Sequence, residues 1–286
     1  GEMFSLTDAT AGANVWTNTG DGTGPVPGYM TATGGTITTD GNFKVHTFNA
    51  SGTFTPTIGG AGLGDFVEYL VVAGAGGGGQ QNINTGGGGG GGAGGVRSTV
   101  TATGGGGSLE SALTLTTQGY AITVGGGGAG ANTTNTAGSV GSDSIFSTIT
   151  SQGGGGGGAG PSPATDGGSG GGAVQATAAK GLGTANQGYD GGFSVGAANH
   201  SACGGGGGGG AVGGNTSVNM GGLGGNGIAT SITGSSVTYA GGGGGGNFYV
   251  GGTIAAGGTG GGGAGGGTSS GITAVSGTAN LGGGGG

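Results

Sequence analysis

The sequence predicts a mostly β and irregular fold, with essentially no α-helix, in which a bundle of polyglycine II helices replaces a hydrophobic core. Glycine accounts for 97 of the 286 residues. Leu, Ile, Val and Phe make up about 15% of the chain, less than a globular core normally needs. Charged residues are few, with 3 basic and 10 acidic side chains, unlike disordered tails. Unbroken glycine runs occupy Gly86–Gly92, Gly153–Gly158, Gly204–Gly210, Gly241–Gly246 and Gly282–Gly286.

Polyglycine II is the regular conformation that suits such runs. A polyproline II helix has about three residues per turn and no internal hydrogen bonds, so its N–H and C=O groups point outward in three directions. Without a Cβ, neighbouring rods can approach closely and bond to one another. Ordering costs roughly 1–2 kcal/mol per residue, so a lone run would remain a flexible tether. We therefore expect several rods to pack main chain against main chain.

The chain divides into three predicted parts. Residues 1–34 form an N-terminal segment, to which we assign a role in attachment. Residues 35–75 form a small β region, in which Phe43–Phe48 alternates apolar and polar positions as a half-buried strand does. Residues 76–286 form the polyglycine II bundle with displayed loops.

Throughout the bundle region, short β-prone segments directly precede the glycine runs. Tyr69–Ala73 precedes Gly76–Gly79, and Ser235–Ala240 precedes Gly241–Gly246. The spacing is irregular, so a fixed-period solenoid is excluded. The polar and aromatic segments between runs are predicted to be loops on a rigid scaffold, where recognition is usually found. The candidate contact residues are Tyr189, Phe193, His200, Phe248, Tyr249, Asn132 and Asn135. The alternative is that the aromatic residues fold back and cap the glycine bundle.

Several functions are excluded by composition. Three cations cannot supply the phosphate contacts of a nucleic-acid-binding protein. The sequence contains no apolar run of 18 residues, so we expect no membrane insertion. The many G-x-G-x-x-G matches lack the strand, helix and lysine context of nucleotide sites. Asp143, Asp166 and Asp190 are isolated from one another, so we interpret them as turn or capping residues. We expect no enzyme activity, no cofactor and no metal.

The single cysteine cannot form an internal disulfide. Cys203 lies just before a glycine run and three residues after His200, so a His/Cys metal pair is conceivable. The pair has no further Cys to complete it, and the only other histidine is His46. We therefore favour a small buried or edge thiol at Cys203.

Parts of the chain resemble the glycine-rich domain of bacteriophage tail-fibre and tail-tip adhesin proteins. The resemblance is carried by Gly52–Pro56 and Val67–Gly79, which are similar to the opening of such a domain, and by Tyr120–Gly130, Gly141–Phe146 and Ser231–Gly241. It covers about residues 43–286. It implies a polyglycine II sandwich whose variable loops contact the host surface. Such domains often end in a β-branched strand, whereas this sequence stops at Gly286, which suggests a piece of a longer protein.

The resulting expectation is a virion protein, extracellular, that displays loops for host-surface receptor binding. Its partners would be a bacterial cell-surface glycan or outer-membrane protein and other virion fibre proteins. A homotrimer and a single chain on a trimeric stalk both remain open. The alternative is a non-recognising structural subunit of a virion fibre, head decoration or extracellular filament. Ice binding and a disordered linker are weaker hypotheses, since the tripeptide repeats and disulfides of polyglycine ice-binding proteins are missing.

Overall fold

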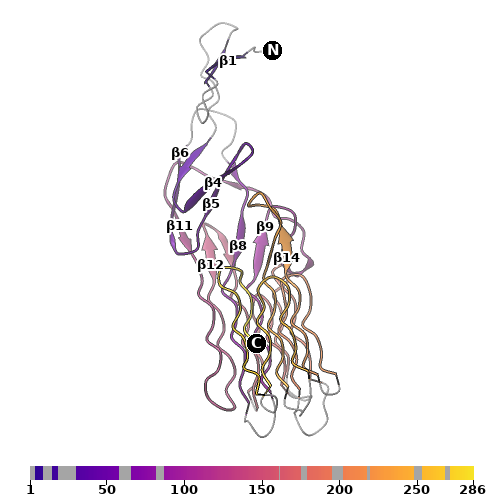
Figure 1. Cartoon of the computed structure of the whole chain (residues 1–286). Coiled ribbons are helices and arrows are strands. Elements are labelled where there is room, and N and C mark those ends of the chain that lie inside the picture. Colours follow the sequence, from indigo (N-terminus) through magenta and orange to yellow (C-terminus); the bar gives the residue numbers. More distant parts are fainter. Residues whose placement is uncertain are drawn as a thin grey trace.

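The computed structural model describes the backbone of strands 4–8 and 15–18, and residues 30–57, 66–81, 87–160, 162–174, 179–194, 202–217, 220–247, 253–267 and 271–286. Within these ranges the only helical element is the 3-10 turn η1, Gly104–Gly106. The fold is mostly β and irregular, as the sequence predicts. Short strands gather at one end of the described bundle, and long extended segments run from them toward the opposite end (Figure 1).

The strands are short and antiparallel. They are β1 (Phe4–Asp8), β2 (Val15–Asn18), β3 (Thr31–Thr33), β4 (Thr36–Asp40), β5 (Phe43–Thr47), β6 (Gly52–Thr57), β7 (Phe66–Val67), β8 (Leu70–Val72), β9 (Val96–Ser98), β10 (Leu113–Thr114), β11 (Tyr120–Thr123), β12 (Ser144–Phe146), β13 (Ile149–Ser151), β14 (Ile228–Thr230) and β15 (Val237–Tyr239). The largest sheet has the order β13-β12-β11-β6-β3. It therefore joins β3, from the predicted N-terminal segment, and β6, from the predicted small β region, to strands that the sequence analysis placed in the bundle region.

Side-chain packing is concentrated where the sheets meet the glycine segments. Phe54, Tyr69, Val71, Leu115 and Phe146 form one buried cluster. The Phe146 ring meets the rings of Phe54 and Tyr69 edge to face, at centroid distances of 6.0 and 6.4 Å, a favourable aromatic arrangement. A second cluster is formed by Ala93, Val96, Ile228 and Ala240. These clusters anchor the glycine segments at one end.

Extended segments, here called rods, make up the rest of the described bundle. Along the rod at 87–95, successive N–H groups donate to three different neighbouring rods and the pattern repeats every third residue, as polyglycine II geometry requires. Gly89, Gly92 and Gly95 donate to Gly158, Gly155 and Gln152; Gly90 and Ala93 donate to Gly204 and Gly207; Gly91 and Gly94 donate to Gly285 and Gly282.

Rod 87–95 is enclosed by a closed ring of rods. Each member of the ring exchanges main-chain hydrogen bonds with rod 87–95 and with the next member. In order around the ring, the members are 73–81, 152–159, 169–174, 202–209, 240–247 and 282–286. This hexagonal packing gives N–H groups of the central rod main-chain partners on the surrounding rods, and the side chains between the rods are few and small, such as those of Ala93 and Cys203.

Close approach explains why these positions are glycine. An ideal Cβ at Gly91 would lie 2.2 Å from the carbonyl oxygen of Gly76, and one at Gly92 would lie 2.2 Å from the carbonyl oxygen of Ser169. At Gly126, on rod 124–131 at the edge of the bundle, an ideal Cβ would have no heavy atom within 4 Å. Interior rods therefore exclude even alanine at such positions, whereas this edge position accepts it.

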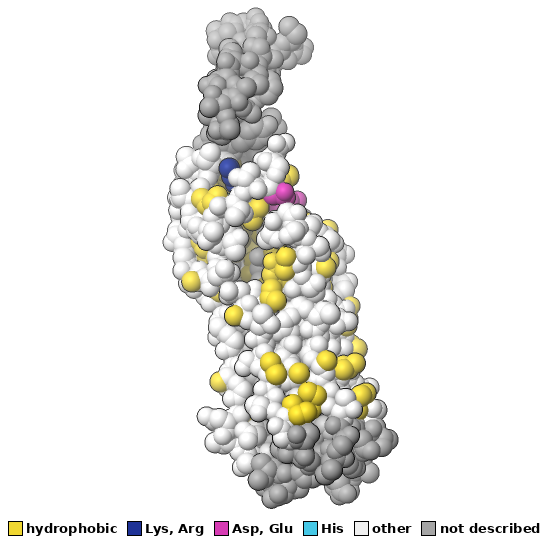
Figure 2. Space-filling view, in the orientation of Figure 1, with side chains coloured by type: hydrophobic (Ala, Val, Ile, Leu, Met, Phe, Trp, Pro, Cys, Tyr) yellow, Lys and Arg dark blue, Asp and Glu magenta, His cyan; other side chains and the backbone are white. Residues whose placement is uncertain are grey.

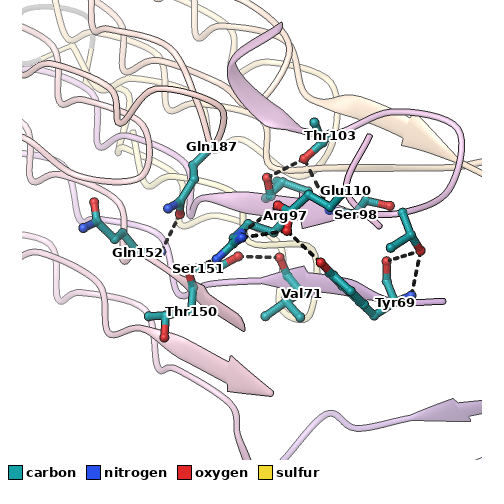
Figure 3. Close-up of polar contacts among 12 residues, drawn as sticks. Tyr69, Val71, Arg97, Ser98, Thr103, Glu110, Thr150, Ser151, Gln152 and Gln187 are labelled. Atoms are coloured by element: carbon teal, nitrogen blue, oxygen red, sulfur yellow. Dashed lines mark hydrogen bonds and ion pairs between the residues drawn. The ribbon is translucent and has the colours of Figure 1, made fainter. Parts of the chain in front are cut away.

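A charged network joins β9 to the residue before β8 and to the segment between η1 and β10 (Figure 3). Arg97 donates from Nε and Nη2 to the two Glu110 carboxylate oxygens at 2.7 and 2.6 Å, and Tyr69 donates its hydroxyl to Glu110 at 2.7 Å. Burial acts to raise the pKa of Glu110, but the hydrogen bonds from Arg97 and Tyr69 and the Arg97 charge outweigh it and lower that pKa. Nearby, Ser151 donates its hydroxyl to the Val71 carbonyl oxygen at 2.7 Å.

We predict that Gly91→Ala and Gly126→Ala have opposite outcomes. Gly91→Ala forces the central rod away from rod 73–81 and should lower the free energy of unfolding by about 1–3 kcal/mol or more, as overpacking does. Gly126→Ala should leave it unchanged or raise it slightly, because alanine restricts the unfolded chain. Denaturant unfolding of both variants measures the difference. Equal stabilities would show that the rods do not pack at the described distances.

The pH dependence of stability should contain a contribution from Glu110. Because its folded-state pKa is lowered, this contribution is fully present above the unfolded value of about 4.3 and is lost as the pH falls through the folded value. Glu110→Gln should therefore flatten the decline in unfolding free energy between about pH 5 and pH 3. Glu68→Gln, at an exposed position, is the matched control and should keep the wild-type slope.

Candidate functional site

Several of the segments between rods begin at the end of the bundle away from the sheets (Figure 1). We call this end the turn end. Ala202 forms a bridge with Asn247, which also bridges to Gly267. Asn247 is 2% exposed, and its side-chain amide donates to the Thr253 carbonyl oxygen at 3.2 Å. Rods far apart in the sequence thus bring the bases of several loops together.

The turn that carries Asn132 and Asn135 lies at this end, and both residues are exposed. Thr136, just after the turn, bridges to Gln80, and the hydroxyls of Thr133 and Thr136 are 2.7 Å apart and hydrogen bonded. Asn135 has a φ of 59°, a left-handed conformation that asparagine tolerates better than most residues. The turn therefore displays exposed polar side chains.

Tyr189 lies elsewhere. It follows the turn at 185–187 near η1, where an ideal Cβ at Gly106 would lie 2.6 Å from its hydroxyl oxygen. Tyr189 is partly buried, and its N–H donates to the Gly208 carbonyl oxygen. The structure thus places Tyr189 at the sheet end of the bundle, in the position of a cap.

Phe193 lies on the side of the bundle and is 45% exposed. The Lys180 ammonium sits 4.7 Å from the centre of its ring and 2.9 Å from an Asp190 carboxylate oxygen, a cation–π contact combined with an ion pair. Burial acts to raise the Asp190 pKa, but the Gly183 N–H and Lys180 outweigh it and lower that pKa. Phe193 is thus held in place with one face of its ring still accessible.

Three candidate residues, His200, Phe248 and Tyr249, lie outside the described residues. The nearest described residues on the chain are Ala202 and Asn247, which form the bridge noted above. The segment that contains His200 therefore ends at one residue of this pair, and the segment that contains Phe248 and Tyr249 begins at the other. Their contact role remains a prediction.

The isolated aspartates hold rods at the edge of the bundle. Asp143, Asp166 and Asp190 each accept a main-chain N–H from a neighbouring segment, at 2.7 to 2.8 Å. Asn215 and Asn226 do the same for Phe193 and Thr259. These side chains supply acceptors where a rod lacks a further neighbour. Such capping agrees with the interpretation made from sequence.

The described ranges contain no cluster of three or more His, Cys, Asp or Glu residues that could hold a metal ion. They also contain no helix with the length and apolar character of a membrane span.

Cys203 is a buried free thiol at the base of these loops. Its Sγ donates to the Gly87 carbonyl oxygen at 2.8 Å and lies 4.0 Å from the Val174 carbonyl oxygen. Burial raises its pKa to about 12, against a smaller opposing effect of the Gly87 hydrogen bond. The thiol therefore fills space and links rods, as expected for a small buried cysteine.

An exposed apolar stripe on the side of the bundle was not predicted from the sequence. Leu182, Phe193, Val212 and Leu223 are 45 to 58% exposed and lie on successive bonded rods, through Gly191 to Gly181, Thr216 to Phe193, and Gly214 to Leu223. We call these four residues the apolar stripe. Larger residues at every third position, as in Met220, Leu223 and Asn226, are the sequence signal that could have shown which side chains of a rod point outward.

Comparison with known proteins identifies a family. A family model described as a glycine-rich domain matches residues 49–286. Neither a curated protein nor a solved structure matches the chain.

We predict that Cys203 resists alkylation in the folded chain. Its burial and raised pKa leave almost no accessible thiolate at pH 8, so iodoacetamide should react at least about a hundredfold more slowly than with the denatured chain. Mass spectrometry of quenched samples measures both rates. Reaction at the rate of an exposed thiol would contradict the described packing of rods 87–95 and 202–209.

Proposed function

The chain belongs to the glycine-rich domain family, and on this premise we propose that it is a bacteriophage tail-fibre or tail-tip adhesin whose loops bind a receptor on the host surface. The observation that best supports this proposal is the arrangement of the loops. The rods are cross-linked by main-chain hydrogen bonds along their length, and the bases of the loops are paired at the turn end. Such a mount presents loops with little loss of conformational entropy on binding, which favours affinity.

The chemistry of the turn end supports a neutral receptor surface. The turn from Asn132 to Thr136 contains only Asn and Thr side chains, which donate and accept hydrogen bonds without charge. Phe248 and Tyr249, which lie outside the described residues, follow Asn247 in the sequence, and aromatic side chains provide large contact area at low entropic cost. A cell-surface glycan or an outer-membrane protein is the proposed receptor class.

The proposed setting is the surface of a virion outside the cell, where the chain assembles with other fibre proteins. Attachment through the N-terminal segment would leave the turn end free, because β1, a described strand of that segment, lies at the opposite end of the picture from the turn end (Figure 1). A homotrimer and a single chain on a trimeric stalk are the two proposed assemblies, and particle symmetry decides between them.

A second candidate is a non-recognising structural subunit of a fibre, head decoration or filament. The apolar stripe favours it, because a row of exposed Leu, Phe and Val residues on the side of the bundle suits lateral packing between subunits. Imaging particles labelled with an antibody to this chain distinguishes the two. An adhesin is labelled at a tip, whereas a subunit is labelled along an axis or over a head.

Receptor binding by the turn end predicts a loss of adsorption on loop substitution. Phage carrying Asn132→Ala together with Phe248→Ala and Tyr249→Ala should adsorb to host cells at least about tenfold more slowly, as expected when hot-spot contacts are removed. Asn42→Ala, in the β4–β5 turn away from the turn end, is the control and should adsorb normally. Both variants should be incorporated into particles equally. Normal adsorption by the loop variant would exclude the turn end as the receptor site.

A further inference from the structure

In the hexagonal packing of the rods, one of the six neighbouring positions around rod 73–81 holds no described rod. Rod 87–95 has six bonded neighbours, but rod 73–81 bonds to only five among the described rods. The five neighbours form an incomplete ring, in which each rod is hydrogen bonded to the next. Rods 124–131 and 282–286, the two ends of this incomplete ring, share no hydrogen bond in the described chain. In order, the neighbours are 124–131, 136–143, 152–159, 87–95 and 282–286.

The main chain of rod 73–81 offers donors to this empty position. Ala73, Gly76 and Gly79 donate to rod 87–95, while Gly74, Gly77 and Gln80 donate to rod 136–143. In a helix with three residues per turn, the N–H groups point in three directions about 120° apart. The N–H groups of Ala75 and Gly78 point in the third direction, away from rods 87–95 and 136–143. That direction is the gap. Both residues are buried, and these two N–H groups have no partner among the described residues, a rare condition in folded proteins.

The gap also presents an acceptor. On rod 282–286, the carbonyl oxygens of Gly282 and Gly285 accept from rod 87–95, and that of Gly284 accepts from Gly263. The Gly283 carbonyl points in the remaining direction of this rod and accepts no N–H from the described residues. Ala75, Gly78 and Gly283 all line the same groove. The groove therefore carries main-chain donors and an acceptor on its floor.

Side chains define the upper part of the groove. It runs from the β4–β5 hairpin down between rods 124–131 and 271–277, and the surface is visibly hollowed between the β strands and the bundle (Figure 2). Exposed apolar side chains line its walls, with Asp40, Lys44 and Glu68 the charged lining residues. The apolar residues are Ile37, Phe43, Phe66, Ile272 and Val275.

We propose that this groove binds an extended glycine-rich segment of another polypeptide, which adds one polyglycine II rod to the bundle. The Ala75 and Gly78 N–H groups lie three residues apart, which matches polyglycine II and not a β-strand, whose period is two. A second copy of this chain is not the occupant, because its described rods are already bonded within its own bundle. Apolar residues of the segment, next to its glycines, occupy the upper part of the groove.

The binding test uses a peptide that copies residues 237–246, a β-prone segment followed by six glycines, with two lysines and a fluorophore added. Fluorescence anisotropy should show binding to the full chain. A control peptide with alanine in place of every glycine should bind at least about tenfold more weakly, because the Cβ atoms that face the floor and walls of the groove would meet the neighbouring rods. No binding by the glycine peptide, or equal binding by the alanine peptide, would overturn the proposal.

Variants locate the site. An ideal Cβ at Gly127 or Gly130 would lie 3.7 or 3.9 Å from the carbonyl oxygens of Ala75 or Gly78, so Gly127→Leu with Gly130→Leu fills the groove without a backbone clash. This variant should lose peptide binding, whereas Ala256→Leu, at an exposed position outside the groove, should keep it. Unchanged binding by the groove variant would place the peptide elsewhere.

Amide hydrogen exchange of the wild-type chain provides a readout that needs no variant. Saturating peptide should slow exchange of the Ala75 and Gly78 amides at least about tenfold, since these N–H groups gain acceptors. Protection confined to other amides, such as those of the turn end, would contradict the proposed site.

Discussion

The structure depends on one constraint: buried main-chain amides must find partners, and here the partners are other main chains at distances that leave no room for a Cβ. In rod 87–95 every third N–H donates to the same neighbour, and the neighbouring carbonyl occupies the space that a side chain would need. Hydrogen bonding and close packing are thus the same contact. A chain with few large apolar residues can be rigid because of this coincidence.

The side chains that remain serve the edges of this lattice. Aromatic and aliphatic clusters anchor the rods at the sheet end. Asp and Asn side chains accept N–H groups where a rod has no further neighbour, and the Cys203 thiol donates to a rod carbonyl where the loops begin. Each type of side chain compensates for a place where main-chain pairing stops.

Much of this arrangement follows from the sequence. Long glycine runs with little charge predicted rods that pack through their main chains, and isolated aspartates predicted capping. The order of rods could not be predicted, because runs of identical residues carry no register information. The sheet was also missed, since β11 pairs with β6 across more than sixty residues of chain. Tyr189 was grouped with the loop residues because sequence does not show at which end of the bundle a turn lies.

The most direct test of the account is amide hydrogen exchange along rod 87–95 of the folded chain. The account predicts protection close to that of global unfolding for Gly89 to Gly94, because each of these N–H groups is buried and bonded to a neighbouring rod. The edge residues Gly126 and Gly127 should exchange much faster, and serve as the internal reference. Exchange of Gly89 to Gly94 at the rate of an unstructured glycine peptide would contradict the bundle.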